Sequence, residues 1–405
     1  MKTIRSIQTF VSLFLAAIWG FLLFGFFSVP NEIVTVADAV PTHSGIYSIQ
    51  NTAKQTRPSV GGKAKNYDAT VKFLGAFPVK NTTLTVNERQ YVEVSGEVFG
   101  LRMYTSGVVI VSTDVIETPQ GPVSPADRAG LKRGDILLEV DRKAVNSHTE
   151  LSALLSAFNG EPLSITYERA GVRRNTTFVP VYSLDKQKYM AGIWVRDSAA
   201  GIGTLTFFDP ESQIFAGLGH AVCDVDTGEE LPLYNGDVVE ASITGCKKGS
   251  SGRAGELCGS FKSQPIGTLF CNDTLGVYGH LTFARARTKR MPVALQSEIK
   301  TGAAQILASV DNNGPRFYDV EIEKLSPTDD RCRNMVIRVT DPALLEKTGG
   351  IVQGMSGSPI IQDQMLVGAV THVFVNEPKR GYGIFSEYMM RKVKNLAQTA
   401  ESMVS

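Results

Sequence analysis

This chain of 405 residues has almost no excess of charge of either sign, because 41 basic and 40 acidic residues leave a net charge of +1. Binding to nucleic acid through phosphates needs a basic field, so we expect no nucleic-acid partner. The chain also lacks an internal repeat and a long block of like charge. Histidines and cysteines number five each, and none of their spacings is a zinc pattern. The sequence therefore implies no metal ion and no organic cofactor.

The cysteines are too few and too scattered for a disulfide-rich scaffold. Five is an odd number, so at least one thiol is free or bonded to another molecule. Cys246 and Cys258 flank a glycine-rich loop and are candidates for a bridge across a hairpin. Buried or free thiols are the alternative. The remaining cysteines are Cys223, Cys271 and Cys332.

An uncharged apolar run, Phe10–Val29, follows Lys2 and Arg5 at the N-terminus. Twenty helical residues span about 30 Å, the thickness of a bilayer core. Basic residues before the run predict a membrane anchor over residues 1–30, with the rest of the chain outside the cytoplasm. A cleaved signal peptide is the alternative, because Ala37-Asp38-Ala39 resembles a cleavage site.

Composition predicts folded, turn-rich β domains: 43% of the residues are hydrophobic, 20% are charged, and 38 are glycines. The length favours two or three domains. We expect a linker and small β region over residues 31–97, in which 40–66 are the linker. A compact module follows at 98–182, and a larger domain at 185–400.

The compact module carries a specific motif, A-x-x-A-G-L-x-x-G-D-I-L-L-x-V, from Ala126 to Val140. Ser124 is a candidate helix cap before it, and Ser147 and Glu150 form a capping box before a second helix. A hairpin that turns at Ala170-Gly171 follows.

This motif resembles that of bacterial PDZ domains, which implies that a peptide adds a strand to an exposed sheet edge. The segment Phe99, Gly100, Leu101, Arg102 and Met103 is the expected carboxylate-binding side. Leu151, Leu154 and Leu155 on the second helix form the other wall of the groove, or are only core residues.

Short apolar runs separated by glycines fill residues 185–385 and predict an all-β sandwich or barrel. The last segment has Met389, Val393 and Leu396 at helical spacing and predicts a C-terminal helix. Ser386 is a candidate cap for that helix.

The strongest catalytic signal is Gly354-Met355-Ser356-Gly357-Ser358-Pro359. A nucleophilic serine needs a tight turn and two backbone N–H groups that converge on the developing oxyanion, and flanking glycines permit that backbone. We expect Ser356 to be the nucleophile, and the N–H groups of Gly354 and Ser356 to form the oxyanion hole. Ser358 is a rival nucleophile, and a plain turn between strands is the alternative.

A serine of ordinary pKa needs a base, and histidine is the usual one. His220 lies in a loop of small residues after a predicted strand, which suits a base. His43 lies in the linker and His148 at a helix start, while His280 and His372 have the context of ordinary strand residues.

Together, G-x-G-T-L-T-F-x-D-P, F-x-x-L-G-H, G-M-S-G-S-P-I and G-A-V-T-H-V-F-V-N-x-P resemble the stage IV sporulation protein B serine peptidases of endospore-forming bacteria. The resemblance implies that His220 and Ser356 are base and nucleophile, and that Asp341 is the third triad member. It also implies a mainly β fold: a chymotrypsin-like double β-barrel preceded by the PDZ domain and the anchor. The strand Val367–Val373 is expected to pair with an extended substrate.

The family further implies secretion into the forespore intermembrane space. There the peptidase is expected to cleave itself near its anchor. It is also expected to cleave a partner in the membrane-bound complex that processes a sigma-factor precursor, as a signal in sporulation. A non-catalytic, membrane-anchored PDZ scaffold is the alternative function. A periplasmic stress protease is disfavoured, because those enzymes usually place PDZ domains after the peptidase.

Asp341 has a second interpretation from the residues around it. Asp341 precedes Pro342 and is equally suited to cap a short helix. Other aspartates considered for the role are Asp224, Asp226, Asp329 and Asp330.

Overall fold

The structure, a computed structural model, describes residues 2–29, 31–36, 43–44, 46–58, 65–282, 289–326 and 333–404. It divides into two units, Met1–Gln90 and Tyr91–Ser405. The Ala37-Asp38-Ala39 site, Asp329, Asp330 and Cys332 lie outside the described residues.

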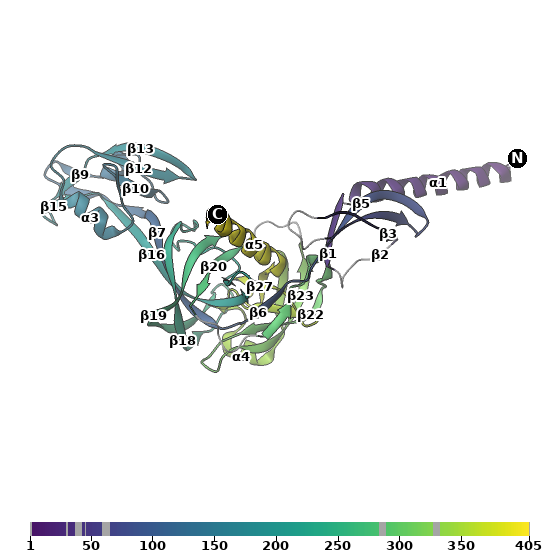
Figure 1. Cartoon of the computed structure of the whole chain (residues 1–405). Helices are drawn as coiled ribbons and strands as arrows, with labels where there is room; N and C mark the ends of the chain where they lie inside the picture. Colours follow the sequence, from purple (N-terminus) through teal and green to yellow (C-terminus); the bar gives the residue numbers. More distant parts are fainter. Residues whose placement is uncertain are drawn as a thin grey trace. The chain divides into compact units, whose positions relative to one another are not determined.

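The first unit contains a helix and one sheet (Figure 1). Its sheet has the order β1-β5-β4-β3-β2, so β3 lies where a linker was expected, and that part of the linker prediction is wrong. No helix in the described part of the chain meets the length and apolarity needed to cross a membrane. The elements are α1 (Lys2–Ser28), β1 (Glu32–Val36), β2 (His43–Ser44), β3 (Tyr47–Pro58), β4 (Lys65–Phe73) and β5 (Phe77–Asn87).

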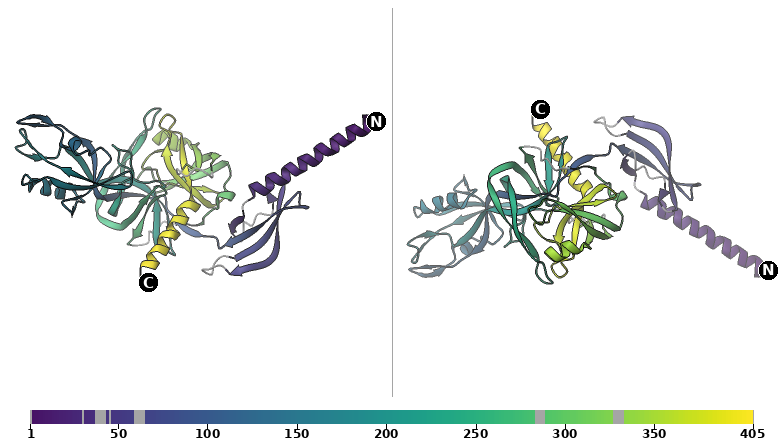
Figure 2. Two further views of the ribbon diagram at one scale, coloured as in Figure 1. Left: turned by 90° about the horizontal axis from the view of Figure 1, so that it is seen from above. Right: turned by 90° about the horizontal axis from the view of Figure 1, so that it is seen from below.

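The second unit contains two closed β circuits, which Figure 2 shows from two further sides. In the first circuit each strand pairs with the next in the order β7-β18-β19-β20-β17-β16, and β16 pairs back to β7. Its strands are β7 (Val98–Thr113), β16 (Ile193–Asp209), β17 (Ile214–Gly217), β18 (Leu233–Lys247), β19 (Gly255–Asp273) and β20 (Gly276–Leu281).

The second circuit is a barrel of order β22-β23-β24-β28-β27-β26. The predicted C-terminal helix, α5 (Ser386–Val404), is confirmed, and it buries Met389 and Val393 completely. The barrel strands are β22 (Gly302–Ala308), β23 (Arg316–Leu325), β24 (Met335–Val339), β26 (Pro359–Gln362), β27 (Met365–Val373) and β28 (Arg380–Phe385). Shorter elements are β6 (Tyr91–Val94), β21 (Lys289–Pro292), η1 (Gln296–Glu298), α4 (Pro342–Thr348) and β25 (Val352–Gln353).

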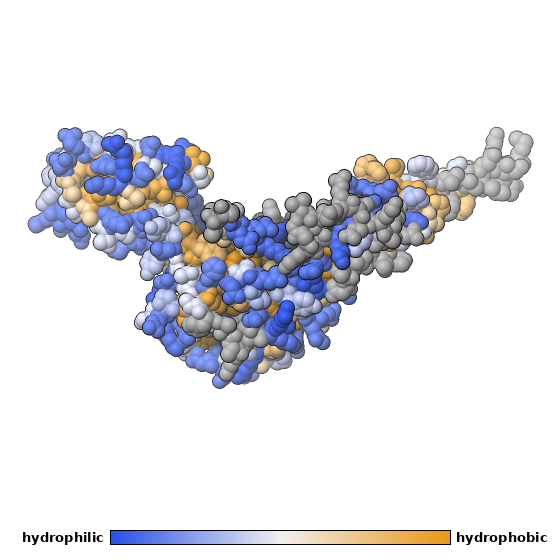
Figure 3. All heavy atoms as spheres, in the orientation of Figure 1, coloured by the Kyte–Doolittle hydropathy of each residue, from blue (hydrophilic) through white to orange (hydrophobic). Residues whose placement is uncertain are grey.

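The PDZ region has its own core, in which Leu151 is buried and Leu154 and Leu155 are partly buried. The predicted caps are present: Ser124 accepts a hydrogen bond from the Asp127 N–H, and Ser147 accepts one from the Glu150 N–H. Its elements are β8 (Ile116–Thr118), β9 (Gly121–Val123), α2 (Pro125–Arg128), β10 (Ile136–Val140), β11 (Lys143–Ala144), α3 (His148–Ser156), β12 (Leu163–Arg169), β13 (Val172–Phe178), β14 (Val181–Ser183) and β15 (Lys188–Met190). Figure 3 shows apolar surface over this region.

Two long strands are shared by the PDZ region and the first barrel. The first half of β7 pairs with β18 in the barrel, and its second half pairs with β10 in the PDZ region. Strand β16 pairs antiparallel with β7 from Ile193↔Thr113 to Thr204↔Val98 and so returns the chain to the barrel. The PDZ region is therefore inserted between two neighbouring barrel strands, and does not simply precede the peptidase domain.

Of the two alternatives for Cys246 and Cys258, the free thiols are present and the bridge is not formed. In the β18–β19 ladder Cys258 pairs with Gly245, and Cys246 pairs with Leu257. Directly paired residues point to the same face, and successive residues alternate, so these two thiols lie on opposite faces of the hairpin.

Candidate active site

The predicted nucleophile lies in a tight turn between β25 and β26. Gly354 and Gly357 have φ angles of +97° and +93°, which favour glycine. A Cβ atom on Gly357 would lie 2.1 Å from the Thr204 carbonyl oxygen and 2.6 Å from the Leu218 nitrogen. The turn therefore requires this glycine in order to dock against β16 and the loop after β17.

Three backbone hydrogen bonds fix the turn, and two of its N–H groups are not used in them. Met355 N–H donates to the Val352 carbonyl (3.1 Å), Gly357 N–H to Val370 (2.8 Å) and Ser358 N–H to Met355 (2.9 Å). The N–H groups of Gly354 and Ser356 take no part in these bonds. These are the two donors expected of an oxyanion hole, which binds charge that appears only during the reaction.

Strand β16 supports the turn from behind through two buried threonines. The Thr204 N–H donates to the Ser356 carbonyl (2.9 Å), and the Thr204 hydroxyl donates to the Gly354 carbonyl (2.8 Å). The Thr206 hydroxyl donates to the Gly357 carbonyl (2.7 Å). Both threonines have 0% exposure, so these bonds are shielded from water. The alternating threonines of G-T-L-T-F were a sequence pattern for this support of the turn, but the predictions from sequence gave them no role.

His220 follows β17 through two residues with left-handed backbone, Leu218 (φ +63°) and Gly219 (φ +69°). Its Nδ1 lies 2.7 Å from the Ala221 carbonyl oxygen. A carbonyl only accepts, so Nδ1 carries the proton and Nε2 has the free lone pair that a base needs. Burial lowers the pKa of His220 below 6.5, while the Ala221 hydrogen bond opposes that shift, so the ring is neutral at neutral pH.

The serine and the histidine meet at strand β27. The Ser356 hydroxyl donates to the Thr371 carbonyl (2.7 Å), and the ring of the next residue, His372, lies 4.5 Å from the ring of His220 at an angle of 36°. The structure therefore places both predicted catalytic residues beside consecutive residues of β27, although the Ser356 hydroxyl donates to a backbone carbonyl and not to the base.

Comparison with known proteins explains this arrangement. Residues 187–390, half of the chain, match the model of the SpoIVB peptidase S55 family. The chain belongs to this family. It is a serine peptidase, and the scaffold alternative loses its main support. Residues 118–169 match the PDZ domain family.

Curated relatives share shorter stretches with this S55 peptidase. A probable periplasmic serine endoprotease DegP-like of Halomonas elongata is 32% identical over 152 residues, 35% of this chain and 29% of the relative. Zinc metalloprotease RasP of Shouchella clausii is 40% identical over 72 residues, 18% of this chain and 16% of the relative. The chain thus covers less than a third of either relative. The solved PDZ domain of an SdrC-like protein from Listeria monocytogenes matches at 22% identity with a TM-score of 0.19, over 22% of this chain and 87% of that chain.

Asp341 is not joined to His220 by a hydrogen bond or an ion pair. Its Oδ1 accepts from the Leu344 N–H (2.9 Å) and its Oδ2 from the Asp319 N–H (3.4 Å), so the carboxylate caps helix α4. The expected orienting role is thus corrected to the alternative that the sequence also allowed.

The other described aspartates near His220 in sequence do not replace it. Asp224 accepts from the N–H groups of Asp226 and Thr227 and forms an ion pair with Arg196 (2.8 Å). Among the groups that the structure describes, no carboxylate shifts the pKa of His220.

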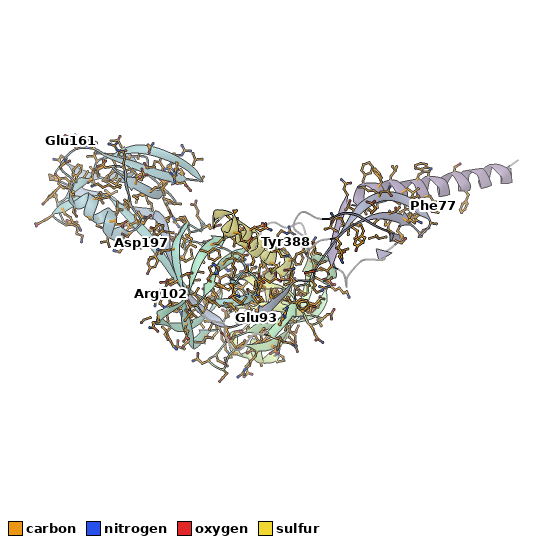
Figure 4. All side chains as sticks on the ribbon, in the orientation of Figure 1. Phe77, Glu93, Arg102, Glu161, Asp197 and Tyr388 are labelled. Carbon is orange, nitrogen blue, oxygen red and sulfur yellow. The ribbon has the colours of Figure 1, made fainter. Side chains whose placement is uncertain are left out.

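The expected peptide-binding segment Phe99–Met103 lies in the first barrel. Its backbone pairs with β16 on one edge and β18 on the other, so no edge remains for an added peptide. The barrel core buries Phe99, Leu101 and Met103. Arg102, which is labelled in Figure 4, donates to backbone carbonyls of β19. Its assignment to the PDZ groove is therefore corrected.

A different edge is available beside helix α3. Among the described strands, residues 193–204 of β16 pair with β7 alone. Asp197, labelled in Figure 4, accepts from the N–H of His148 (2.8 Å) and bonds its Nδ1 (2.7 Å), which ties β16 to the start of α3. Ile193 and Val195 pack against the PDZ core, while Trp194 is 63% exposed.

Proposed function

We propose that this S55 peptidase is an endopeptidase with Ser356 as nucleophile, His220 as base, and the N–H groups of Gly354 and Ser356 as oxyanion hole. The observation that carries the proposal is the Gly354–Ser358 turn, held open toward β27 by its own bonds and by Thr204 and Thr206.

The reaction begins when the Ser356 hydroxyl leaves the Thr371 carbonyl and turns to His220 Nε2. His220 takes the proton as the serine oxygen attacks the scissile carbonyl, and the oxyanion hole holds the negative oxygen. The proton then passes to the leaving amine, and an acyl ester remains on Ser356. Water, deprotonated by His220, cleaves the ester and restores the enzyme.

Extended peptides are the proposed substrates and ligands. In β27 the pairing with β26 ends at Ala369, before the residues that contact Ser356 and His220, which favours this end of Val367–Val373 for substrate pairing. In the PDZ region, the edge of β16 from Ile193 to Arg196 beside α3 is the proposed site of strand addition.

The finer role follows the family. We propose that the peptidase cleaves itself near its N-terminal segment, and that it cleaves a partner in the membrane-bound complex that processes a sigma-factor precursor in sporulation. The proposed location is the forespore intermembrane space, with residues 1–30 as a membrane anchor before release. The support is the family resemblance together with Lys2, Arg5 and the apolar run Phe10–Val29.

Ser356→Ala tests the chemistry, with Ser358→Ala as the matched control. Ser358 is fully buried and its hydroxyl has no partner, so its loss should leave activity intact. We expect only Ser356→Ala to abolish labelling by a fluorophosphonate and cleavage of an unstructured reporter. Labelled, active Ser356→Ala protein would exclude Ser356 as nucleophile.

N-terminal sequencing tests self-processing in the same pair. Wild type and Ser358→Ala should show shorter forms that begin between about residues 40 and 75, because self-cleavage is proposed to occur near the N-terminal segment and chain termini are common sites of cleavage. Ser356→Ala should lack them. A single identical start in all three proteins would indicate removal by signal peptidase.

A further inference from the structure

His372 lies at an irregular point of β27. Val370 pairs with Gly383 but Val373 pairs with Gly381, so β27 has one more residue than β28 over this stretch, which is a β-bulge. The bulge contains both Thr371, whose carbonyl accepts from Ser356, and His372, whose ring lies beside His220. Bulges often redirect a side chain next to an active site.

The His372 ring is an unfavourable choice for packing alone. Its Nδ1 is buried and has no hydrogen-bond partner among the residues that the structure describes, which costs stability that an apolar ring would not lose. Burial, and to a lesser extent the neighbouring His220 and Arg333, lower the pKa of His372 from 6.5 to about 4. These are the titratable groups that act on it within the described residues, so the ring is neutral near pH 7.

His220 lacks the anchor that a triad carboxylate supplies. The acceptor that the described part of the chain offers to its ring, the Ala221 carbonyl, belongs to the next residue and therefore moves with the same loop. That bond fixes the tautomer but does not fix the ring relative to the serine. His372 belongs to β27, the strand whose Thr371 carbonyl holds Ser356.

We propose that His372 is a positioning residue: its ring, which lies 4.5 Å from the ring of His220 at an angle of 36°, holds the base in register with Ser356 in the place of a carboxylate. The proposal rests on the assignment of His220 and Ser356 as base and nucleophile. Residue 372 therefore needs a flat, uncharged side chain. Phenylalanine should replace His372 with most activity retained, and alanine should not.

The test compares three variants of the full chain. His372→Ala should lower kcat by about 10- to 100-fold with little change in KM, because a misplacement of about 1 Å can cost about 100-fold. His372→Phe should retain most of kcat and raise Tm, because it removes the orphan nitrogen. His280→Ala is the matched control, since the His280 ring also lies beside another ring (Phe270, 4.9 Å) but outside the site, and this variant should leave kcat unchanged.

The pH profile separates positioning from folding. Removal of the ring in His372→Ala admits water to His220 and raises its lowered pKa, so the acid limb of kcat/KM should move to higher pH. His372→Phe should keep the wild-type limb. Loss of fold would reduce the amount of active protein, counted by fluorophosphonate labelling, without moving the limb.

Three outcomes overturn the proposal: His372→Ala with wild-type kcat, a rise in KM alone, or His372→Phe as impaired as His372→Ala. A rise in KM alone would make His372 part of the substrate wall. Retained activity in Ser356→Ala would instead refute the underlying assignment, so the two failures are distinguishable.

Discussion

Replacement of Asp341 by asparagine distinguishes a role as helix cap from a role in orienting His220. The two roles predict very different effects on kcat. In the structure its carboxylate caps α4 through the Leu344 N–H at 2.9 Å. Asparagine caps as well as aspartate, so Asp341→Asn should change stability little, whereas Asp341→Ala should lose about 1 kcal/mol. For a domain of about 150–250 residues that loss lowers Tm by about 2–4 °C.

A triad role predicts a different result. The amide would favour the wrong imidazole tautomer and lower kcat about 10⁴-fold, or about 5 kcal/mol at 1.36 kcal/mol per factor of ten. We expect Asp341→Asn and Asp341→Ala to keep kcat per labelled active site near the wild-type value, measured by reporter cleavage after fluorophosphonate titration. A loss above 100-fold in folded Asp341→Asn would refute the capping assignment, because it would show that the carboxylate reaches His220 in the working enzyme.

Three further predictions follow from single contacts. Burial lowers the pKa of His220, and a base must be neutral to act. We therefore expect kcat/KM to persist below pH 6.5 and to fall only as the pH drops through the pKa of His220 in the folded enzyme. An acid limb of the kcat/KM profile at or above pH 6.5 would contradict this. Thr204→Val removes the hydroxyl bond to the Gly354 carbonyl and should lower kcat about fivefold, the equivalent of about 1 kcal/mol; unchanged kcat would show that the bond does not hold the turn. Peptide mapping without reductant should find no Cys246–Cys258 cross-link, and its detection would contradict the β18–β19 register.

Local patterns predicted local structure well. The caps at Ser124 and Ser147, the hairpin turn at Ala170-Gly171 and helix α5 all depend on neighbours within a few residues, and all are present. The nucleophile turn was predictable for the same reason, since its glycines report a special backbone directly.

Long-range pairing was not predictable in this way. Phe99–Met103 has the composition of any buried strand, and only its pairing with β18 assigns it to the barrel. His372 looked like an ordinary strand histidine, because the bulge that places it depends on β28. Asp341 before Pro342 suits both a cap and a triad, and the choice depends on where His220 lies in three dimensions.

The shared strands also determine how the PDZ region can be removed. Because β7 leaves the barrel where β16 returns, Tyr104 and Ser198 are paired neighbours on antiparallel strands. Deletion of residues 98–182 would take away the barrel half of β7 and open the first circuit. A cut between Tyr104 and Ser198 with a two-residue turn would instead leave an ordinary β-hairpin and both circuits complete. In the architecture of this chain the PDZ region is thus an enlarged hairpin loop, an addition that the peptidase fold can carry or lose without a change in its strand order.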